Sequence, residues 1–224
     1  INKKKNTITK VLSLLRKNGN LLNQSFKINI KKNIPHGAGL GGGSSNAAVL
    51  LKYFNSNMKL KLNKNKIQKL AKNIGFDVPI NLVRKNTFLY GKPDRIFRLN
   101  RKFGLNLIIV YPNIICSTKA IYQKTRKIDR SKLQSFVNIK DKKKLINILT
   151  NEKNDLEKIV IRTYPKIGKI INYIKSQEGC YFSRITGSGS ACIGIFSHMK
   201  KAIYAKKMIK LKHPRYWIKV SKSI

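Results

Sequence analysis

The stretch Pro35-His-Gly-Ala-Gly-Leu-Gly-Gly-Gly-Ser-Ser-Asn-Ala-Ala, residues 35–48, decides how this sequence is interpreted. Glycine lets the backbone adopt positive φ angles and approach a ligand closely. We expect a helix to follow over Ala47–Phe54, and a helix N-terminus offers unpaired N–H groups and a partial positive charge to an anion. The stretch therefore predicts a phosphate site, in which the hydroxyls of Ser44 and Ser45 are available to phosphate oxygens or to a metal ion.

Two common phosphate loops match this stretch poorly. The pattern Gly37-x-Gly39-x-x-Gly42 fits the dinucleotide fingerprint, which also needs an acid about 20 residues further on. No Asp or Glu occurs before Asp77. A Walker A loop needs a lysine before its Ser or Thr, and none is present. A flexible turn without function is the remaining alternative, but it does not explain a proline before the glycines and a helix start after them.

The charge of the chain is strongly positive, and two interpretations are open. The 224 residues include 49 Lys and Arg against 8 Asp and Glu, for a net charge of +41. This could indicate a polyanion binder, but the lysines are scattered and Asn and Ile are also overused, which favours drift in an AT-rich gene. In either case a field this positive attracts anionic substrates. It also makes each of the eight acids informative.

Other classes are excluded or not favoured by composition. Hydrophobic residues make up 42% of the chain, enough for a core, so disorder is excluded for most of its length. No apolar window is long enough to span a membrane, and no signal peptide opens the sequence. The cysteines and histidines are Cys116, Cys180, Cys192, His36, His198 and His213. Their spacing predicts no metal site and no disulfide, and it favours reduced core thiols in a cytosolic protein.

The hydrophobic pattern predicts mixed helices and short strands. Helices are expected at about 6–17, 47–54, 64–74, 118–124, 141–149, 152–161, 165–177 and 198–210, and strands at 26–31, 86–90, 95–99, 105–111, 181–185, 191–196 and 216–220. Because the two kinds do not alternate strictly, we expect an α+β fold in both halves. We place a domain boundary near residue 100, which gives domains over residues 1–100 and 101–224.

The glycine stretch resembles the ATP loop of the GHMP small-molecule kinases, and two further motifs follow in the family's order. Gly75-Phe-Asp-Val-Pro resembles the family segment that carries a catalytic aspartate, and Ile185-Thr-Gly-Ser-Gly-Ser-Ala-Cys resembles its third motif, a glycine loop beside the active site. Asn154-Asp-Leu-Glu is also typical. The resemblance covers essentially the whole chain. It implies a two-domain kinase with a first part like domain 2 of ribosomal protein S5 and a ferredoxin-like second part.

The resemblance also implies an activity, which is transfer of a phosphoryl group from ATP, with Mg²⁺, to an alcohol. The triple glycine before Ser-Ser-Asn-Ala-Ala is most similar to a family member of non-mevalonate isoprenoid synthesis, which phosphorylates the tertiary 2-hydroxyl of a cytidine-diphosphate-linked methylerythritol. Another GHMP kinase, such as one for homoserine or mevalonate, stays open, and a basic nucleic-acid-binding protein is the less favoured alternative. We expect a cytoplasmic enzyme with a small-molecule substrate, no nucleic-acid partner and no membrane partner, in an oligomeric state that stays open.

Site residues follow from the resemblance position by position. The catalytic residue is Asp77. The ATP-binding residues are Asn6, Pro35, His36, Gly37, Ala38, Gly39, Leu40, Gly41, Gly42, Gly43, Ser44 and Ser45. The substrate-binding residues are Thr118, Tyr122, Thr186, Gly187, Ser188 and Gly189, with Tyr122 stacked on the cytosine. From the residues alone, Asp77 could be a helix N-cap, Tyr122 a core tyrosine and residues 186–190 a simple hairpin turn.

The resemblance also leaves part of the family pattern unmatched. Family members carry an earlier segment with a catalytic lysine and part of the cytosine site, and no residues here match it. On this basis the chain is expected to be an N-terminally truncated fragment that is inactive by itself.

Overall fold

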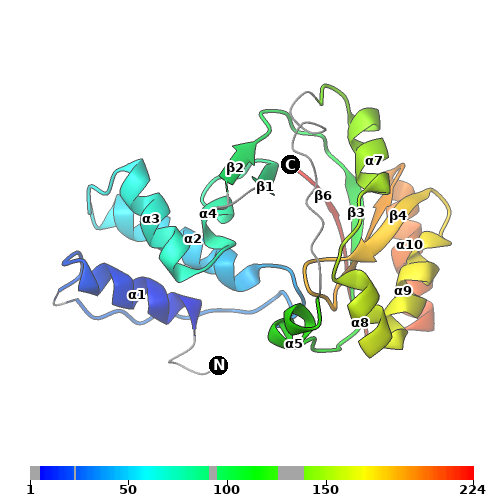
Figure 1. Cartoon of the computed structure of the whole chain (residues 1–224), viewed down its shortest axis with the longest axis horizontal. Coiled ribbons are helices and arrows are strands. Elements are labelled where there is room, and N and C mark those ends of the chain that lie inside the picture. Colours follow the sequence, from blue (N-terminus) through cyan, green and yellow to red (C-terminus); the bar gives the residue numbers. More distant parts are fainter. Residues whose placement is uncertain (1–5, 23, 91–94, 126–138) are drawn as a thin grey trace. The chain divides into compact units, whose positions relative to one another are not determined.

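The computed structural model describes residues 6–22, 24–90, 95–125 and 139–224 (Figure 1). Contacts divide the chain into two compact units. The first, here called the helical unit, comprises Ile1–Ile34 and Gly41–Arg84, and the second, the sheet unit, comprises Pro35–Leu40 and Lys85–Ile224. The domain boundary expected near residue 100 stays a prediction, and each unit is described by itself.

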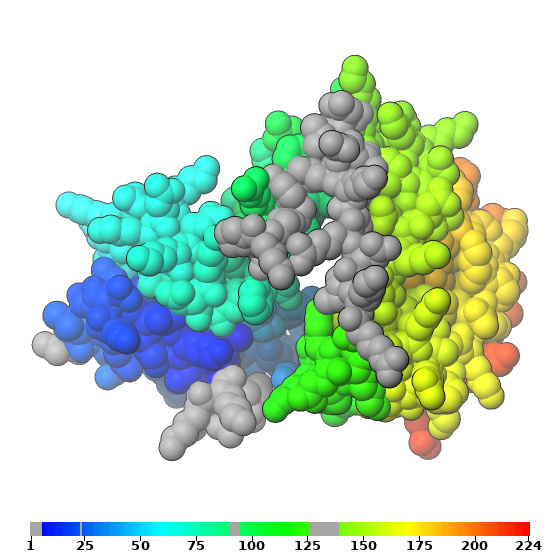
Figure 2. Space-filling view, in the orientation of Figure 1, coloured from blue at the N-terminus to red at the C-terminus, as the bar shows by residue number. Residues whose placement is uncertain are grey.

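Four helices build the described part of the helical unit: α1 (Thr7–Lys17), α2 (Gly42–Asn57), α3 (Lys64–Ile74) and α4 (Val78–Asn81). The helices α1 and α3 are amphipathic as the sequence predicts, and their side chains meet on the face shown in Figure 2. Each begins at an asparagine cap, Asn6 and Asn63, whose side-chain oxygen accepts a backbone N–H. The shared core includes Val11, Leu15, Leu21, Ala47, Ala48, Leu51, Phe54, Leu70, Ala71, Ile74 and Val78.

Two predictions in this unit are wrong in detail. Phe26–Lys31 has no regular secondary structure, although Phe26 packs on Phe54 with ring centroids 4.8 Å apart. Alternating apolar residues allow a strand, but a strand also needs a hydrogen-bonded neighbour, and no described segment pairs with this one. The helix expected from Ala47 begins five residues earlier, at Gly42. The last glycines and both serines of the glycine stretch are therefore helical.

The sheet unit contains a four-stranded antiparallel sheet of order β4-β5-β3-β6. Its strands are β3 (Asn106–Tyr111), β4 (Cys180–Ile185), β5 (Cys192–Phe196) and β6 (Trp217–Lys222), and its helices are α5 (Thr118–Gln123), α7 (Lys142–Asn151), α8 (Glu157–Thr163), α9 (Pro165–Lys175) and α10 (Met199–Lys212). Helices follow β3 and β5, and a hairpin joins β4 to β5, which is the β-α-β-β-α-β arrangement of ferredoxin-like folds. The predicted ferredoxin-like part is confirmed. A separate antiparallel pair consists of β1 (Thr87–Tyr90) and β2 (Arg95–Arg98), which lie where the sequence predicts strands.

Two cores hold this sheet in place. The helices α9 and α10 pack on one face of the sheet, with Ile108, Ile174, Ile185, Phe196 and Ile209 among their shared buried residues (Figure 1). The helix α7 packs on another cluster that includes Leu145, Phe182 and Ile195. The helix expected over residues 152–161 is shorter, because α8 begins at Glu157.

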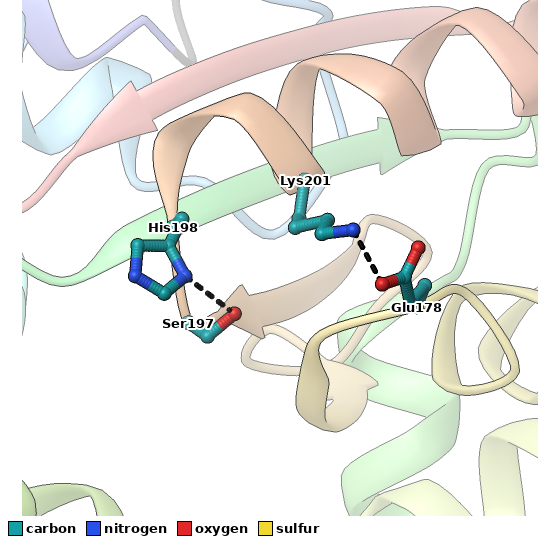
Figure 3. Close-up of polar contacts among 4 residues, drawn as sticks. All are labelled: Glu178, Ser197, His198 and Lys201. Carbon is teal, nitrogen blue, oxygen red and sulfur yellow. Dashed lines mark hydrogen bonds and ion pairs between the residues drawn. The ribbon is translucent and has the colours of Figure 1, made fainter.

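The start of α10 is held by polar contacts at the molecular surface (Figure 3). Lys201 forms an ion pair with Glu178, and His198 Nδ1 lies 3.1 Å from Ser197 Oγ. The side chains of Lys201 and Glu178 are 39% and 73% exposed. Since exposed ion pairs contribute at most about 1 kcal/mol, this contact orients the helix start more than it stabilises the fold.

All three cysteines are free thiols, as the sequence predicts. Burial raises the pKa of Cys180 to about 11, and it also raises the pKa values of Cys116 and Cys192. Protonated thiols are poor nucleophiles and metal ligands, so these side chains serve packing. None of the helices in the described part of the chain combines the length and apolar character needed to cross a bilayer.

Candidate functional site

The N-terminus of α2 lies open in the helical unit. Gly41 caps the helix with φ +64°, and no side chain bonds to the first turn as a cap. An added Cβ at Gly41 or Gly42 would meet no atom within 4 Å. The N–H groups of Gly42, Gly43 and Ser44 belong to the first turn and have no partner within the helix. Since these N–H groups also have no partner elsewhere among the described residues, the helix start presents donors and a partial positive charge to open space at the position where the sequence predicts a phosphate site.

The start of α1 lies beside this helix start. Thr7 Oγ1 donates a hydrogen bond to Gly43 O at 3.0 Å. A Cβ added to Gly43 would lie 3.4 Å from Thr7 Oγ1. Asn6 caps α1 by accepting the Ile8 N–H at 3.0 Å. Its amide nitrogen has no hydrogen bond with another described residue. Asn6 is predicted to contact the nucleotide. Its side-chain oxygen caps α1, and its amide nitrogen is available as a donor near the start of α2.

Asp77 lies at the start of α4 and is exposed. It occupies the N-cap position but makes no capping hydrogen bond, so the alternative of a hydrogen-bonding cap is wrong. Its carboxylate has no hydrogen bond or ion pair with another described residue. The next residue, Val78, is fully buried in the core shared with α2. Its burial fixes the backbone that carries the Asp77 carboxylate. Asp77 is also the sole acidic residue in the sequence of the helical unit.

The predicted third motif is a tight turn between β4 and β5 of the sheet unit. Gly189 N donates to Thr186 O at 2.9 Å, and Thr186 N donates to Ala191 O at 2.9 Å. Ser188 is 7% exposed, and its hydroxyl lies 2.9 Å from Thr118 Oγ1. Two of the predicted substrate-binding residues are therefore in direct contact. The alternative of a hairpin turn is correct for the backbone, but it does not account for this contact.

The first half of the glycine stretch packs on the same turn. Thr186 Oγ1 donates to Gly39 O, and Ala191 N donates to Ala38 O at 3.1 Å. Gly39 has φ +72°, and a Cβ there would lie 2.5 Å from Thr186 O and 2.8 Å from Gly189 O. Only glycine fits this position. Ala38 is buried beside the turn, whereas His36 and Gly37 are exposed and Pro35 and Leu40 half-buried.

Tyr122 lies on α5, which Ser117 caps by accepting the Ala120 N–H at 3.3 Å. The neighbouring Ile121 enters the core, whereas Tyr122 is 51% exposed. The alternative of a core tyrosine is therefore wrong, and the ring is free to contact a ligand.

Two residues of this region have a role that the sequence did not reveal. Asn154 and Glu157 bind the backbone at the end of β4 and in the turn that follows it. The available signal was the segment Asn154-Asp-Leu-Glu itself, in which a carboxylate is retained in a strongly basic chain.

Comparisons with known proteins agree over both halves of the chain. Residues 6–85 match the model of the GHMP kinases N terminal domain, and residues 133–210 match that of the GHMP kinases C terminal domain. The chain is 35% identical over 219 residues to 4-diphosphocytidyl-2-C-methyl-D-erythritol kinase of Pelagibacter ubique, covering 98% of this chain and 76% of the relative. It is 32% identical over 224 residues to the enzyme of the same name from Wolbachia pipientis wMel, covering 97% and 75%.

Solved structures show the same fold. A crystal structure of 4-(cytidine 5'-diphospho)-2C-methyl-D-erythritol kinase matches with a TM-score of 0.77 at 23% identity, covering 100% of this chain and 80% of the other. Homoserine kinase from Cytophaga hutchinsonii matches with a TM-score of 0.70 at 15% identity, covering 100% and 77%. At these identities the likeness concerns the fold, and the predicted two-domain α+β architecture is confirmed.

Proposed function

The chain is a small-molecule kinase of the GHMP family, and we propose that it transfers the γ-phosphoryl group of ATP to the 2-hydroxyl of 4-diphosphocytidyl-2-C-methyl-D-erythritol. The observation that carries the substrate is the likeness to curated enzymes of that name over nearly the whole chain. This activity belongs to non-mevalonate isoprenoid precursor synthesis. We further propose a cytoplasmic setting and a small molecule, not a nucleic acid, as the partner.

The ATP phosphates are proposed to bind at the start of α2. Free N–H groups of Gly42, Gly43 and Ser44 would bind phosphate oxygens, and the hydroxyls of Ser44 and Ser45 would add further donors. The open space above Gly41 and Gly42 supports this assignment, because it leaves room for a phosphate against the backbone. Asn6 would contact the nucleotide through its free amide nitrogen.

Mg²⁺ is proposed to accompany ATP, and the residues present fit it. Mg²⁺ commonly binds through substrate phosphates and one or two carboxylates, without a dedicated protein cage. The described residues contain no cluster of three His, Cys, Asp or Glu side chains. In the helical unit the hydroxyls of Ser44 and Ser45, in the first turn of α2, are oxygen donors that fit the ion beside the phosphates. The ion would neutralise charge on the phosphates.

Asp77 is proposed to accept the proton of the acceptor hydroxyl and to orient its oxygen towards the phosphoryl group. A carboxylate without a hydrogen-bond partner among the described residues is available for both tasks. Positioning and electrostatic stabilisation supply most of the catalysis of phosphoryl transfer. A tertiary hydroxyl is crowded, which makes its orientation by Asp77 more important.

The remaining substrate contacts are proposed for the sheet unit. Tyr122 would stack on the cytosine, since every base offers a π-face to an aromatic ring. Thr118, Thr186, Gly187, Ser188 and Gly189 would contact the rest of the substrate. The hydrogen-bonded pair of Thr118 and Ser188 supports a common role.

A substrate panel tests the proposed reaction. The protein, expressed from its complete coding sequence, is incubated with ATP, Mg²⁺ and one of three alcohols: the diphosphocytidyl methylerythritol, homoserine or mevalonate. We expect ADP release that depends on the first alcohol alone. Preferred turnover of homoserine or mevalonate would contradict the proposed substrate while leaving the family assignment intact.

Tyr122→Ala is expected to raise the KM for the diphosphocytidyl substrate and leave the KM for ATP unchanged. Loss of one base stack costs about 1–3 kcal/mol, which corresponds to an increase of about 5- to 150-fold. Steady-state kinetics measure both constants, and Tyr122→Phe should retain most of the affinity because it keeps a ring. Tyr204→Ala is the matched control, since Tyr204 is similarly exposed, at 55%, on α10. Equal effects of Tyr122→Ala and the control would refute the stacking role.

A further inference from the structure

The last residue of β4 is bound by two side chains from the segment before α8. Glu157 Oε2 accepts the Ile185 N–H at 2.7 Å, and Asn154 Nδ2 donates to Ile185 O at 3.3 Å. The neighbouring Thr186 pairs with Ala191 across the hairpin, so the backbone groups of Ile185 point away from β5. The two side chains thus take the place that a further strand would occupy.

The same segment also contacts the turn itself. Asn154 Nδ2 donates a second hydrogen bond to Gly187 O at 2.8 Å, and its Oδ1 accepts the Leu156 N–H at 3.0 Å. Val160 of α8 is fully buried, and a Cβ on Gly189 would lie 3.3 Å from its Cγ1. The turn is therefore supported from Ile185 to Gly189 by one short stretch of chain.

On its other side the supported turn meets residues placed in the site. Ser188 lies against Thr118, and Thr186 binds Gly39 of the glycine stretch. Neither Asn154 nor Glu157 is among these contacts, so both would act on the ligand indirectly, through the turn. Because Thr186 and Ser188 belong to the same hydrogen-bonded turn, a small displacement of the turn would move both residues together.

We propose that Asn154 and Glu157 are positioning residues, which hold the turn Thr186–Gly189 in the geometry needed to bind and orient the alcohol substrate. The proposal rests on the proposed function, because it needs the turn to contact that substrate. Glu157 acts as a hydrogen-bond acceptor for Ile185, and Asn154 joins the turn to the start of α8. A misplacement of about 1 Å in a positioned group can lower a rate by about 10²-fold.

The test compares three variants with the wild-type protein. Glu157→Ala removes the acceptor for Ile185, whereas Glu157→Gln keeps an oxygen acceptor and removes the charge. Asn154→Asp keeps the acceptor for the Leu156 N–H and removes both bonds to the turn, because it places a carboxylate oxygen against the carbonyl oxygens of Ile185 and Gly187. Asp155→Ala is the matched control, because Asp155 lies between the two residues and has no hydrogen bond or ion pair with another described residue.

Two quantities are measured: kcat/KM for the alcohol, and the hydrogen-exchange rate of the Ile185 amide. We expect Glu157→Ala and Asn154→Asp to lower kcat/KM by at least about tenfold, with ATP affinity unchanged. Glu157→Gln and Asp155→Ala should remain near the wild-type value. Faster exchange at Ile185 is expected in Glu157→Ala alone, since it alone removes that acceptor.

The outcomes separate this inference from the proposed function. If the protein prefers a different alcohol, the proposed substrate is wrong, and the same comparison is made with the preferred one. Faster exchange without a loss of kcat/KM shows a purely structural role and overturns the inference. Equal losses in Glu157→Gln and Glu157→Ala also overturn it, because the charge and not the hydrogen bond would then matter.

Discussion

Asp77→Asn is expected to lower turnover by roughly 10²–10⁴-fold, the usual contribution of a positioned acid or base. An amide keeps the shape of the side chain but does not accept a proton at neutral pH. Because the carboxylate makes no capping bond and has no partner among the described residues, folding and ATP affinity should stay nearly unchanged. Turnover is measured at saturating ATP, and ATP affinity by titration.

A structural role for Asp77 makes the opposite prediction. Replacing a capping aspartate by alanine lowers the free energy of unfolding by about 1 kcal/mol and preserves turnover. Asp141→Ala is the useful comparison, because Asp141 does cap a helix, with its Oδ1 2.7 Å from Lys144 N. Preserved turnover in Asp77→Ala, with a stability loss like that of Asp141→Ala, would exclude the base.

Gly42→Val is expected to abolish measurable ATP binding. Gly42 is helical, and its Cβ position faces open space, so the protein itself tolerates a side chain there. Valine has at least as favourable a helix propensity as glycine, and no loss of stability is expected. The branched side chain would instead fill the space assigned to phosphate and block the free N–H groups.

Ser56→Val is the matched control for this variant. It introduces the same side chain at an exposed position near the other end of α2. Thermal unfolding of both variants checks the fold, and calorimetric titration with ATP checks binding. Unchanged nucleotide affinity in Gly42→Val would remove the start of α2 as the phosphate site.

The fold was largely predictable because its signals are local. The amphipathic pattern predicts α1 and α3, and the apolar run at β3 predicts a buried strand. Phe26–Lys31 was not predictable in the same way, since a strand depends on a partner elsewhere in the chain. The start of α2 was missed because glycines suggest a loop, although a first helical turn tolerates them when its donors face open space.

The site was predictable as a set of motifs but not as a set of contacts. Sequence order places the glycine stretch and the turn Thr186–Gly189 far apart, and only the folded sheet unit shows that Gly39 touches the turn. Glu157 was missed because a carboxylate in a lysine-rich segment suggests a surface ion pair. Its actual partner is the backbone N–H of Ile185, and a backbone partner cannot be inferred from the type of its residue.

The side chains that bind the end of β4 also bear on aggregation. β4 is an edge strand, and an edge with free N–H and C=O groups can recruit strands from other chains. The N–H and C=O groups of Ile185 are already hydrogen-bonded to Glu157 and Asn154. Further along the same strand, Lys175 donates to Tyr181 O. The opposite edge strand, β6, carries exposed Lys219 and Lys222. In a chain so rich in isoleucine and asparagine, both edges are therefore protected against intermolecular strand addition.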